Sequence, residues 1–215
     1  MTSPPGGGTR RRRPVAVPIA ALAMAAGLGI TAALGGFDEA PEEPPEQLGP
    51  GSSLDQGEFM TTFVESRTAV QPGLFGGPGK RFLEVVLEVT NQGAETTVVG
   101  SPSQGGTPGF SFAKSLLKMV PEIKSPYGPT VSVPAGDASS SQLHPGMAST
   151  VVLRYELPQG QRPPRRVQLD VGTFEMSEGF ILAPEWNLVA DGDDEDAPPK
   201  VAAQVTLPVR QGGTV

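Results

Sequence analysis

Cysteine is absent from the chain, and histidine occurs only once, as His144. The absence of cysteine excludes a disulfide framework, a thiolate metal site, a cysteine nucleophile and a lipid-modified N-terminal cysteine. A Ser-His-Asp triad would have to use His144, which stands in the turn-like stretch "QLHPGM", and no G-x-S-x-G motif presents a serine. We therefore predict that the protein is not an enzyme, and we assign it no catalytic residue and no cofactor.

Positive charge is scarce beyond residue 13. From Asp38 onward, 12 Lys or Arg residues stand against 23 Asp or Glu residues, so this part carries a net charge of −11. Nucleic acids are bound chiefly through basic residues, and we exclude nucleic-acid binding on this ground. Gly and Pro supply 52 of the 215 residues, a proportion that favours short strands and turns over long amphipathic helices.

One long apolar segment interrupts this polar composition. Four arginines at 10–13 precede the uncharged segment 14–37. As a helix, its 24 residues would span roughly 36 Å, enough to cross a hydrocarbon core of about 30 Å. We predict a cytoplasmic tail (1–13), a transmembrane helix (14–37) and a C-terminal part outside the cytoplasm, because arginines stay inside.

Two alternatives for this segment remain open. A cleaved signal peptide has a charged start and a small-x-small site, and the triplet Ala33-Leu34-Gly35 would serve as one. The apolar run is longer than a typical signal, which favours an uncleaved anchor. A core helix of a soluble domain would need a polar face, and the segment has none.

The rest of the chain has three predicted parts. Residues 38–57, "DEAPEEPPEQLGPGSSLDQG", are acidic and rich in Pro and Gly, which is typical of an extended linker. Residues 58–210 form the predicted extracytoplasmic domain, and residues 211–215 form a short C-terminal tail. The linker would hold the domain away from the membrane surface.

Alternation of apolar and polar residues predicts strands in the domain. In "RFLEVVLEVTNQG" the residues predicted to face inward are Leu83, Val85, Leu87 and Val89, with Glu84, Val86, Glu88 and Thr90 outward. Corresponding inward sets are Val151, Leu153, Tyr155 and Leu157, then Val167, Leu169, Val171 and Thr173, and finally Val201, Ala203, Val205, Leu207 and Val209. "EFMTTFVESRTAV" is the predicted first strand, and "ETTVVG" is predicted to return along the first set after a turn at Asn91-Gln92-Gly93.

Weaker segments complete the pattern. "TPGFSFA", "TVSVP" and "EGFILAPEWNLV" are candidate strands. In "SFAKSLLKMVP", the spacing of Phe112, Leu116 and Met119 predicts one or two helical turns that Ser111 caps and Pro121 ends. Six to eight short strands with Gly/Pro turns predict an all-β sandwich or barrel.

Two of these strands carry a resemblance. "FLEVVLEVTNQGAETTVV", which ends in Asn91-x-Gly93, and "LHPGMASTVVLRYELPQG", which Leu143-x-Pro145-Gly146 opens, resemble a family of exported bacterial domains of unknown function. The family is similar to the mycobacterial immunoprotective extracellular antigen. The resemblance implies an immunoglobulin-like β-sandwich over residues 55–210 and an exported location, and it implies no catalytic residue. The lipid-bearing cysteine that many members use is missing here.

Three features of the sequence are candidate binding sites. The acidic run from Asp191 to Asp196 offers hard oxygen ligands for calcium but lacks the spacing of an EF-hand, so a solvated loop is the favoured interpretation. His144 and Met147, with Met119 as a third ligand, would suit copper(I), although two ligands three residues apart do not make a site. Trp186 could anchor a partner, but a core position is favoured. We assign no metal site.

These observations predict a single-pass membrane protein with a non-enzymatic interaction or accessory domain at the cell surface. Its expected partners are the membrane and an unidentified protein. The alternative is a secreted, signal-cleaved protein that binds a metal or a small ligand.

Overall fold

The computed structural model describes residues 43–73, 79–125, 127–136, 138–177, 184–192, 194 and 197–212. The chain divides into two units, Met1–Glu43 and Pro44–Val215. The predicted cytoplasmic tail, transmembrane helix and first part of the linker lie outside the described residues. Within the described ranges, no helix has the length and apolar character needed to cross a membrane.

The second unit is built almost entirely from strands, so the predicted all-β class is confirmed. One short 3₁₀ helix, η2 (Phe112–Ser115), precedes β6. The strands are β1 (Glu46–Leu48), β2 (Ser53–Asp55), β3 (Phe59–Gln71), β4 (Lys80–Asn91), β5 (Thr97–Val98), β6 (Leu116–Val120), β7 (Thr130–Ala135), β8 (Ala138–Ser140), β9 (Gln142–Leu143), β10 (Ala148–Glu156), β11 (Arg166–Val171), β12 (Phe174–Ser177), β13 (Glu185–Leu188) and β14 (Ala203–Arg210).

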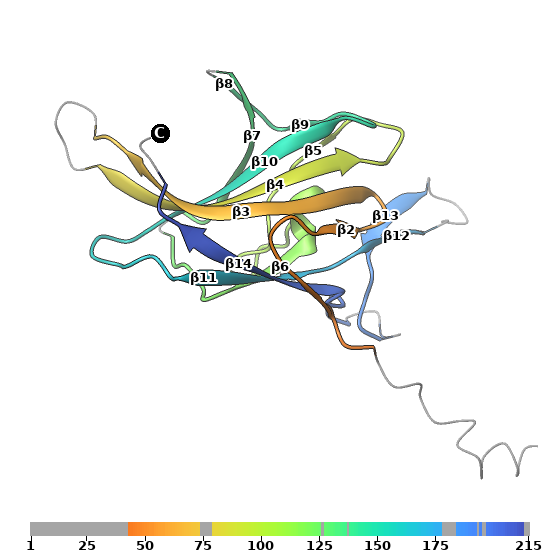
Figure 1. Cartoon of the computed structure of the whole chain (residues 1–215). Helices are drawn as coiled ribbons and strands as arrows, with labels where there is room; N and C mark the ends of the chain where they lie inside the picture. The colour runs from red at the N-terminus through yellow and green to blue at the C-terminus, as the bar shows by residue number, and fades with distance from the viewer. Residues whose placement is uncertain are drawn as a thin grey trace, which may run out of the picture. The chain divides into compact units, whose positions relative to one another are not determined.

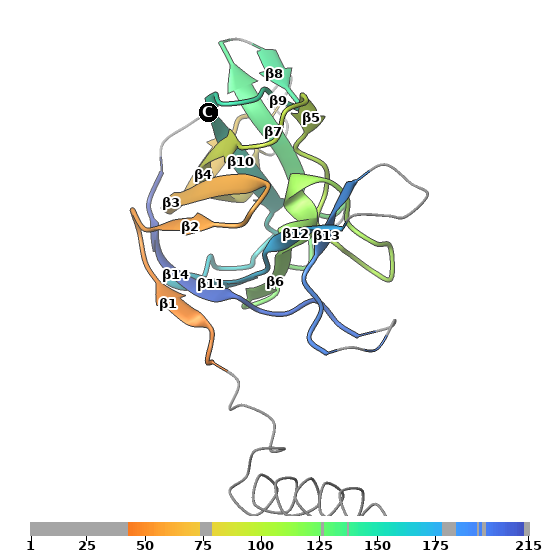
Figure 2. The same cartoon turned by 90° about the vertical axis from the view of Figure 1, so that its right-hand side faces the viewer.

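Ten strands form one curled sheet that folds into two layers. Its order is β6-β11-β14-β3-β4-β10-β7-β8, with β1 beside β14 and β2 beside β3. Figure 1 shows β3, β4 and β10 in one layer and β14 and β11 in the other, and Figure 2 shows the curl end-on. The layers join where β14 runs parallel to β3, with Val209 opposite Ser66. The arrangement is consistent with a β-sandwich.

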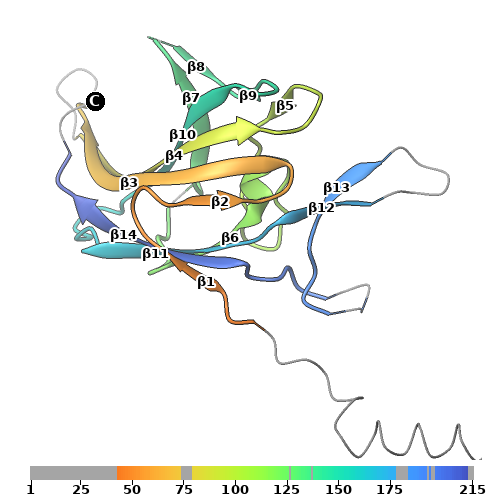
Figure 3. The same cartoon turned by 45° about the vertical axis from the view of Figure 1, so that its right-hand side comes forward.

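Two smaller pairs complete the strand pairing in the described ranges. Strand β5 pairs with β9, and β12 pairs with β13. The β12–β13 hairpin extends beyond the end of the two layers (Figure 3).

The hydrophobic core lies between the layers, and the predicted alternation fills it. The four predicted residues of β4 are fully buried, and most of the other predicted inward residues are buried too, although Thr173, Val201 and Val209 are only half-buried. The buried inward residues are Leu83, Val85, Leu87 and Val89 on β4, Val151, Leu153 and Tyr155 on β10, Val167, Leu169 and Val171 on β11, and Ala203, Val205 and Leu207 on β14.

Three phenylalanines from distant parts of the chain meet at one end of this core. Phe59 is the first residue of β3. The centroid of its ring lies 5.2 Å from the ring centroid of Phe112 in η2 and 5.5 Å from that of Phe174 in β12, and both pairs are edge to face. Edge-to-face pairs add to the free energy gained by burial alone. Phe59 therefore joins β3 to η2 and to β12.

The predicted linker is too long at its C-terminal end. Strand β1 pairs in parallel with β14, and β2 pairs with β3. The side chain of Gln56 is fully buried, and the backbone nitrogen of Phe174 donates to the Gln56 carbonyl at 2.7 Å. The turn continues through Gly57, whose φ of +85° favours glycine. The sequence did not predict β1 and β2 because both are short and lack apolar alternation. Pairing with β14 and β3 stabilises them as strands.

The predicted return of residues 95–100 along β4 is wrong. Both edges of β4 are already occupied, by β3 and β10. Strand β5 pairs instead with β9, where Thr97 stands opposite Leu143. The turn after β4 therefore leads away from that strand rather than into a hairpin.

The predicted helix after Ser111 is also wrong beyond one turn. Residues 112–115 form η2, but Leu116 to Val120 form strand β6. Ser111 has a φ of 54° and makes no side-chain cap. Both Leu116 and Met119 are buried because the pairing of β6 with β11 shifts register between them. A β-bulge inserts one extra residue and so gives two inward residues the spacing of a helix.

Of the remaining strand predictions, two are confirmed, one is wrong and one is confirmed in part. "TVSVP" is confirmed as β7, and the segment predicted as first strand is confirmed as β3, although β1 and β2 precede it. The segment 107–113 forms no strand, and Phe110 makes only an isolated bridge with Ser101. β13 occupies the last part of "EGFILAPEWNLV", whose residues 178–183 lie outside the described ranges.

Candidate functional site

A row of polar side chains crosses the outer face of the β3–β4–β10–β7 layer. Arg67 on β3 stands opposite Glu84 on β4, which stands opposite Arg154 on β10. Arg154 in turn stands opposite Thr130 on β7. Side chains directly opposite one another on neighbouring strands are close enough to interact. The fold therefore brings a carboxylate between two guanidinium groups.

A β-bulge in β3 places Arg67 in this row. Phe59 and Phe63 point into the core before the bulge, and the register shifts between Phe63 and Glu65. After the shift Ser66 is buried, so Glu65 and Arg67 face outward. Bulges commonly re-aim side chains in this way.

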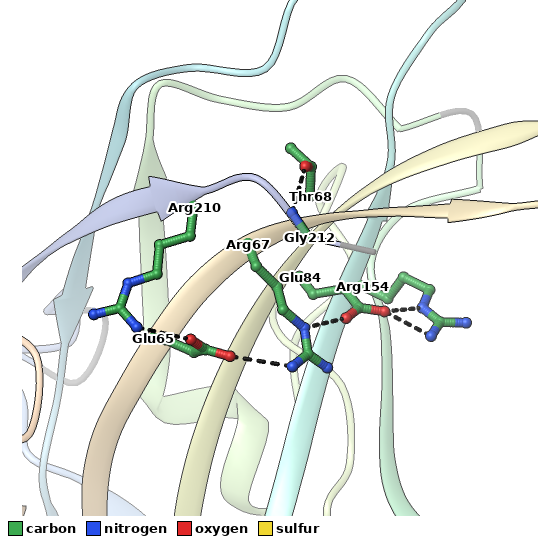
Figure 4. Close-up of polar contacts among 7 residues, drawn as sticks. All are labelled: Glu65, Arg67, Thr68, Glu84, Arg154, Arg210 and Gly212. Carbon is green, nitrogen blue, oxygen red and sulfur yellow. Dashed lines mark hydrogen bonds and ion pairs between the residues drawn. The ribbon is translucent and has the colours of Figure 1, made fainter. Parts of the chain in front are cut away.

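Glu84 is held by both arginines, as Figure 4 shows. Its side chain is only 1% exposed. The Nε of Arg67 donates to Oε2 at 3.0 Å, and the Nε and Nη2 of Arg154 donate to Oε1 at 2.9 and 2.6 Å. Glu65 extends the network, since it accepts from Arg67 Nη1 at 3.1 Å and lies 3.4 Å from Arg210 Nη1.

The network carries one net positive charge, because three arginines stand against two glutamates. The hydrogen bond to Glu84 raises the pKa of Arg67, so Arg67 remains charged. Between residues 44 and 215 the chain has 12 basic and 19 acidic residues. The site is therefore positively charged, whereas the unit as a whole carries a net charge of −7.

A groove of about 500 Å³ opens over this row. The hydroxyl groups of Thr130, Ser132 and Ser139 line it together with the two arginines and Glu84. Pro134, Ala138 and Val152 provide its apolar wall. Small-molecule sites commonly have volumes of about 300–1,000 Å³ and combine apolar walls with a few placed polar groups. The groove has both properties.

The two arginines are held in position, but some of their N–H donors make no hydrogen bond among the described residues. The guanidinium of Arg154 also lies over the ring of Phe82, with Cζ 5.2 Å from the ring centre. Among the described residues, the Nη2 of Arg67 and the Nη1 of Arg154 have no hydrogen-bond partner. Their side chains are 41% and 33% exposed. Donors therefore remain available to a ligand.

The three residues that would suit copper(I) are not brought together. His144 is exposed in the turn before β10, where its Nδ1 lies 3.0 Å from the Thr96 hydroxyl. Met147 is 58% exposed, whereas Met119 is buried in the core opposite Leu169. In the part of the chain that the structure describes, no group of three or more His, Cys, Asp or Glu residues could hold a metal ion.

The acidic run lies partly outside the described residues. Asp191 and Asp194 are described and exposed, whereas Asp193, Glu195 and Asp196 are not described. Ala190 and Pro199, which flank the run, form an isolated antiparallel bridge. Its predicted role as a solvated loop stays a prediction.

Trp186 lies on β13, half-buried, and packs against the hydrophobic core. Its backbone carbonyl accepts a hydrogen bond of 3.1 Å from the Nζ of Lys114. The favoured core position agrees with this packing.

The two segments that carry the resemblance meet at a structural joint. The Asn91 side chain is buried, donates to the Leu143 carbonyl at 3.0 Å and accepts from the Gly93 nitrogen at 2.8 Å. The Gly146 nitrogen donates to the Asn91 carbonyl at 2.8 Å. These contacts satisfy buried polar groups, so the shared pattern serves the fold.

A second, smaller hollow of about 240 Å³ lies beside β6 and is lined in part by Tyr155. Burial raises the pKa of Tyr155 to about 12. The folded state thus holds the phenolic proton more tightly than the unfolded state, whose tyrosine pKa is about 10. The contribution of Tyr155 to the free energy of unfolding should be fully present below pH 10. It should be lost as the pH rises from 10 toward 12, by up to about 1.4 kcal/mol per pH unit.

Ultraviolet titration tests this directly, because the chain has only two tyrosines. We expect the phenol of Tyr155 to ionise about two pH units above an ordinary tyrosine. Tyr155→Phe should remove this transition, and Tyr127→Phe, at a position 87% exposed, should leave it in place. Ionisation of Tyr155 near pH 10 in folded Tyr127→Phe would contradict the expected burial.

The groove was not predicted from the sequence. Glu84 was correctly predicted to face outward, but the alternation does not show that it lies buried between two arginines. Arg67 gave no signal, because the bulge that turns it outward has no mark in the sequence. Comparisons with protein-family models, with curated proteins and with solved structures found no match.

Proposed function

We propose that the protein is a membrane-anchored, non-enzymatic binding module. Its immunoglobulin-like β-sandwich lies outside the cytoplasm and binds its partner in the groove over Glu84. The two-layered arrangement, in which the larger strands pair antiparallel except where β14 runs parallel to β3, supports the immunoglobulin-like class. The charged start and the uncharged segment 14–37 support the anchor.

One observation carries the proposal of binding. Two arginines are fixed by a buried carboxylate at the floor of a groove and keep donors that face no partner among the described residues. Binding sites need side chains whose positions are set before the ligand arrives. A sheet face that served only as a solvated surface would not require a buried glutamate.

Binding of a small ligand rather than a protein is the second candidate, and the groove's volume favours it. This candidate also accommodates a secreted protein without an anchor. Cell fractionation separates the anchored form from the secreted form.

The location is tested in bacterial cells that express the full chain. We expect the intact chain in the membrane fraction, an unprocessed N-terminus by mass spectrometry, and digestion of the sandwich by protease added to intact cells. A mature N-terminus beyond residue 37 would replace the anchor with a cleaved signal. Recovery of the chain from the cytosol, protected until cells are broken, would overturn the proposed location.

A further inference from the structure

We propose that the groove binds a ligand through a carboxylate group, with Arg154 and Arg67 as the residues that contact it. Glu84 is the positioning residue that holds both guanidinium groups. This inference rests on the groove being the binding site of the proposed module, and it adds the chemical class of the ligand.

The donors that remain in the groove select an oxyanion. A guanidinium presents its N–H groups in a planar fork that matches the two oxygens of a carboxylate. The Nε of each arginine donates a hydrogen bond to Glu84, and one Nη of each has no partner among the described residues. Because Glu84 accepts from both side chains, the unused donors belong to two groups already held around one point. Little side-chain entropy is left to lose when a ligand binds.

Charge favours a carboxylate over a phosphate. The groove contains two arginines and one glutamate, so a monoanion neutralises it. A phosphate that carries two charges would leave the site negative, on a unit whose net charge is already −7. Like charges at this density repel an incoming anion. A monoanionic carboxylate avoids that penalty.

The remaining lining describes the rest of the ligand. The hydroxyls of Thr130, Ser132 and Ser139 can donate and accept hydrogen bonds, which suits amide or hydroxyl groups next to the carboxylate. Val152 and Pro134 offer apolar surface for a small aliphatic group. A short carboxylic acid and the C-terminal end of a peptide both fit this description.

NMR titration of the full-length chain, labelled with ¹⁵N-arginine, tests the ligand class. The probes are acetate, acetyl-alanyl-alanine, its C-terminal amide and inorganic phosphate at constant ionic strength. We expect saturable shifts of the Arg67 and Arg154 Nε–H signals with both carboxylates and none with the amide. Tighter binding of the peptide acid than of acetate identifies a chain end as the source, and equal binding identifies a small acid. Phosphate binding more tightly than both carboxylates would overturn the proposal.

Variants test the residues. Arg154→Gln should weaken acetate binding by about tenfold, the effect of losing about 1.4 kcal/mol of binding free energy. Arg166→Gln makes the same charge change on β11, where Arg166 is exposed and has no ion pair among the described residues, and should bind as wild type. Equal acetate affinity in Arg154→Gln and wild type would refute the assignment. If Arg154→Gln does not fold, Arg154→Lys keeps the charge and should still lose affinity, because it lacks the fork.

Glu84→Gln distinguishes positioning from a general role in stability. The change raises the charge of the groove by one, so phosphate should gain affinity relative to acetate. The Nε–H signals of both arginines should also exchange faster with solvent, because their hydrogen-bond acceptor is weaker. A purely structural role would lower the affinity for all probes together and leave their ratio unchanged.

Discussion

Replacing Phe59 with alanine is expected to lower the free energy of unfolding by about 3–5 kcal/mol. The side chain is fully buried, and its removal would leave a cavity where β3, η2 and β12 meet. The change also removes both edge-to-face contacts, with Phe112 and Phe174. Each such contact contributes about 0.5–1.5 kcal/mol beyond burial.

Denaturant unfolding of matched variants measures this effect. Phe110→Ala is the control, because Phe110 is 54% exposed and should lose less than about 1 kcal/mol. Phe59→Leu keeps much of the volume and should fall between the two. A loss for Phe59→Ala that matched the loss for Phe110→Ala would show that the three rings do not join β3 to η2 and β12 as described.

The layers themselves could be predicted from the sequence. The inward residues of β4, β10, β11 and β14 recur at every second position, so the period of two is visible in the sequence, although Val86 on β4 and Val152 on β10 are buried on the opposite face. The all-β class followed from the same alternation. What the alternation does not contain is the order of the strands, and the wrong partner predicted for residues 95–100 has this cause.

Two β-bulges account for two other errors. In β6 the register shift gives Leu116 and Met119 the spacing of a helix, although both are inward residues of a strand. In β3 the shift after Phe63 turns Arg67 outward, toward Glu84. A bulge depends on how the partner strand pairs, so the local sequence does not reveal it.

The candidate groove shows the same limit at the level of single side chains. Glu84 and Glu88 have equivalent places in the pattern of β4, yet only Glu84 is buried. The difference lies in the neighbours, since Arg67 and Arg154 stand beside Glu84 and are 17 and 70 residues away from it in the chain. Only the register of three strands brings these charges together.

Gln56 is the clearest case in which tertiary contacts override composition. It lies at the end of a segment whose Pro, Gly and acidic residues are typical of a linker. Its side chain nevertheless donates to the Gly172 carbonyl at 2.7 Å and accepts from the Thr61 hydroxyl at 2.6 Å. Both bonds are buried, and the first of them connects the β2–β3 turn to the segment between β11 and β12.

Gln56→Ala is therefore expected to lower the free energy of unfolding by about 2–4 kcal/mol. The change leaves two buried groups, the Gly172 carbonyl and the Thr61 hydroxyl, without their partner. Each unsatisfied buried group costs about 1–3 kcal/mol. For a unit of this size the thermal midpoint should fall by roughly 4–16 °C.

Two further variants separate hydrogen bonding from packing. Gln56→Met keeps the length of the side chain but makes neither bond, so its loss of stability should approach that of Gln56→Ala. Gln92→Ala is the matched surface control, because the Gln92 side chain is exposed and bonds to Asp55 and Gly57 at the solvent edge. It should change stability by less than about 0.5 kcal/mol. If Gln56→Ala were as mild as Gln92→Ala, the boundary of the sandwich would lie after residue 57, as the composition alone suggests.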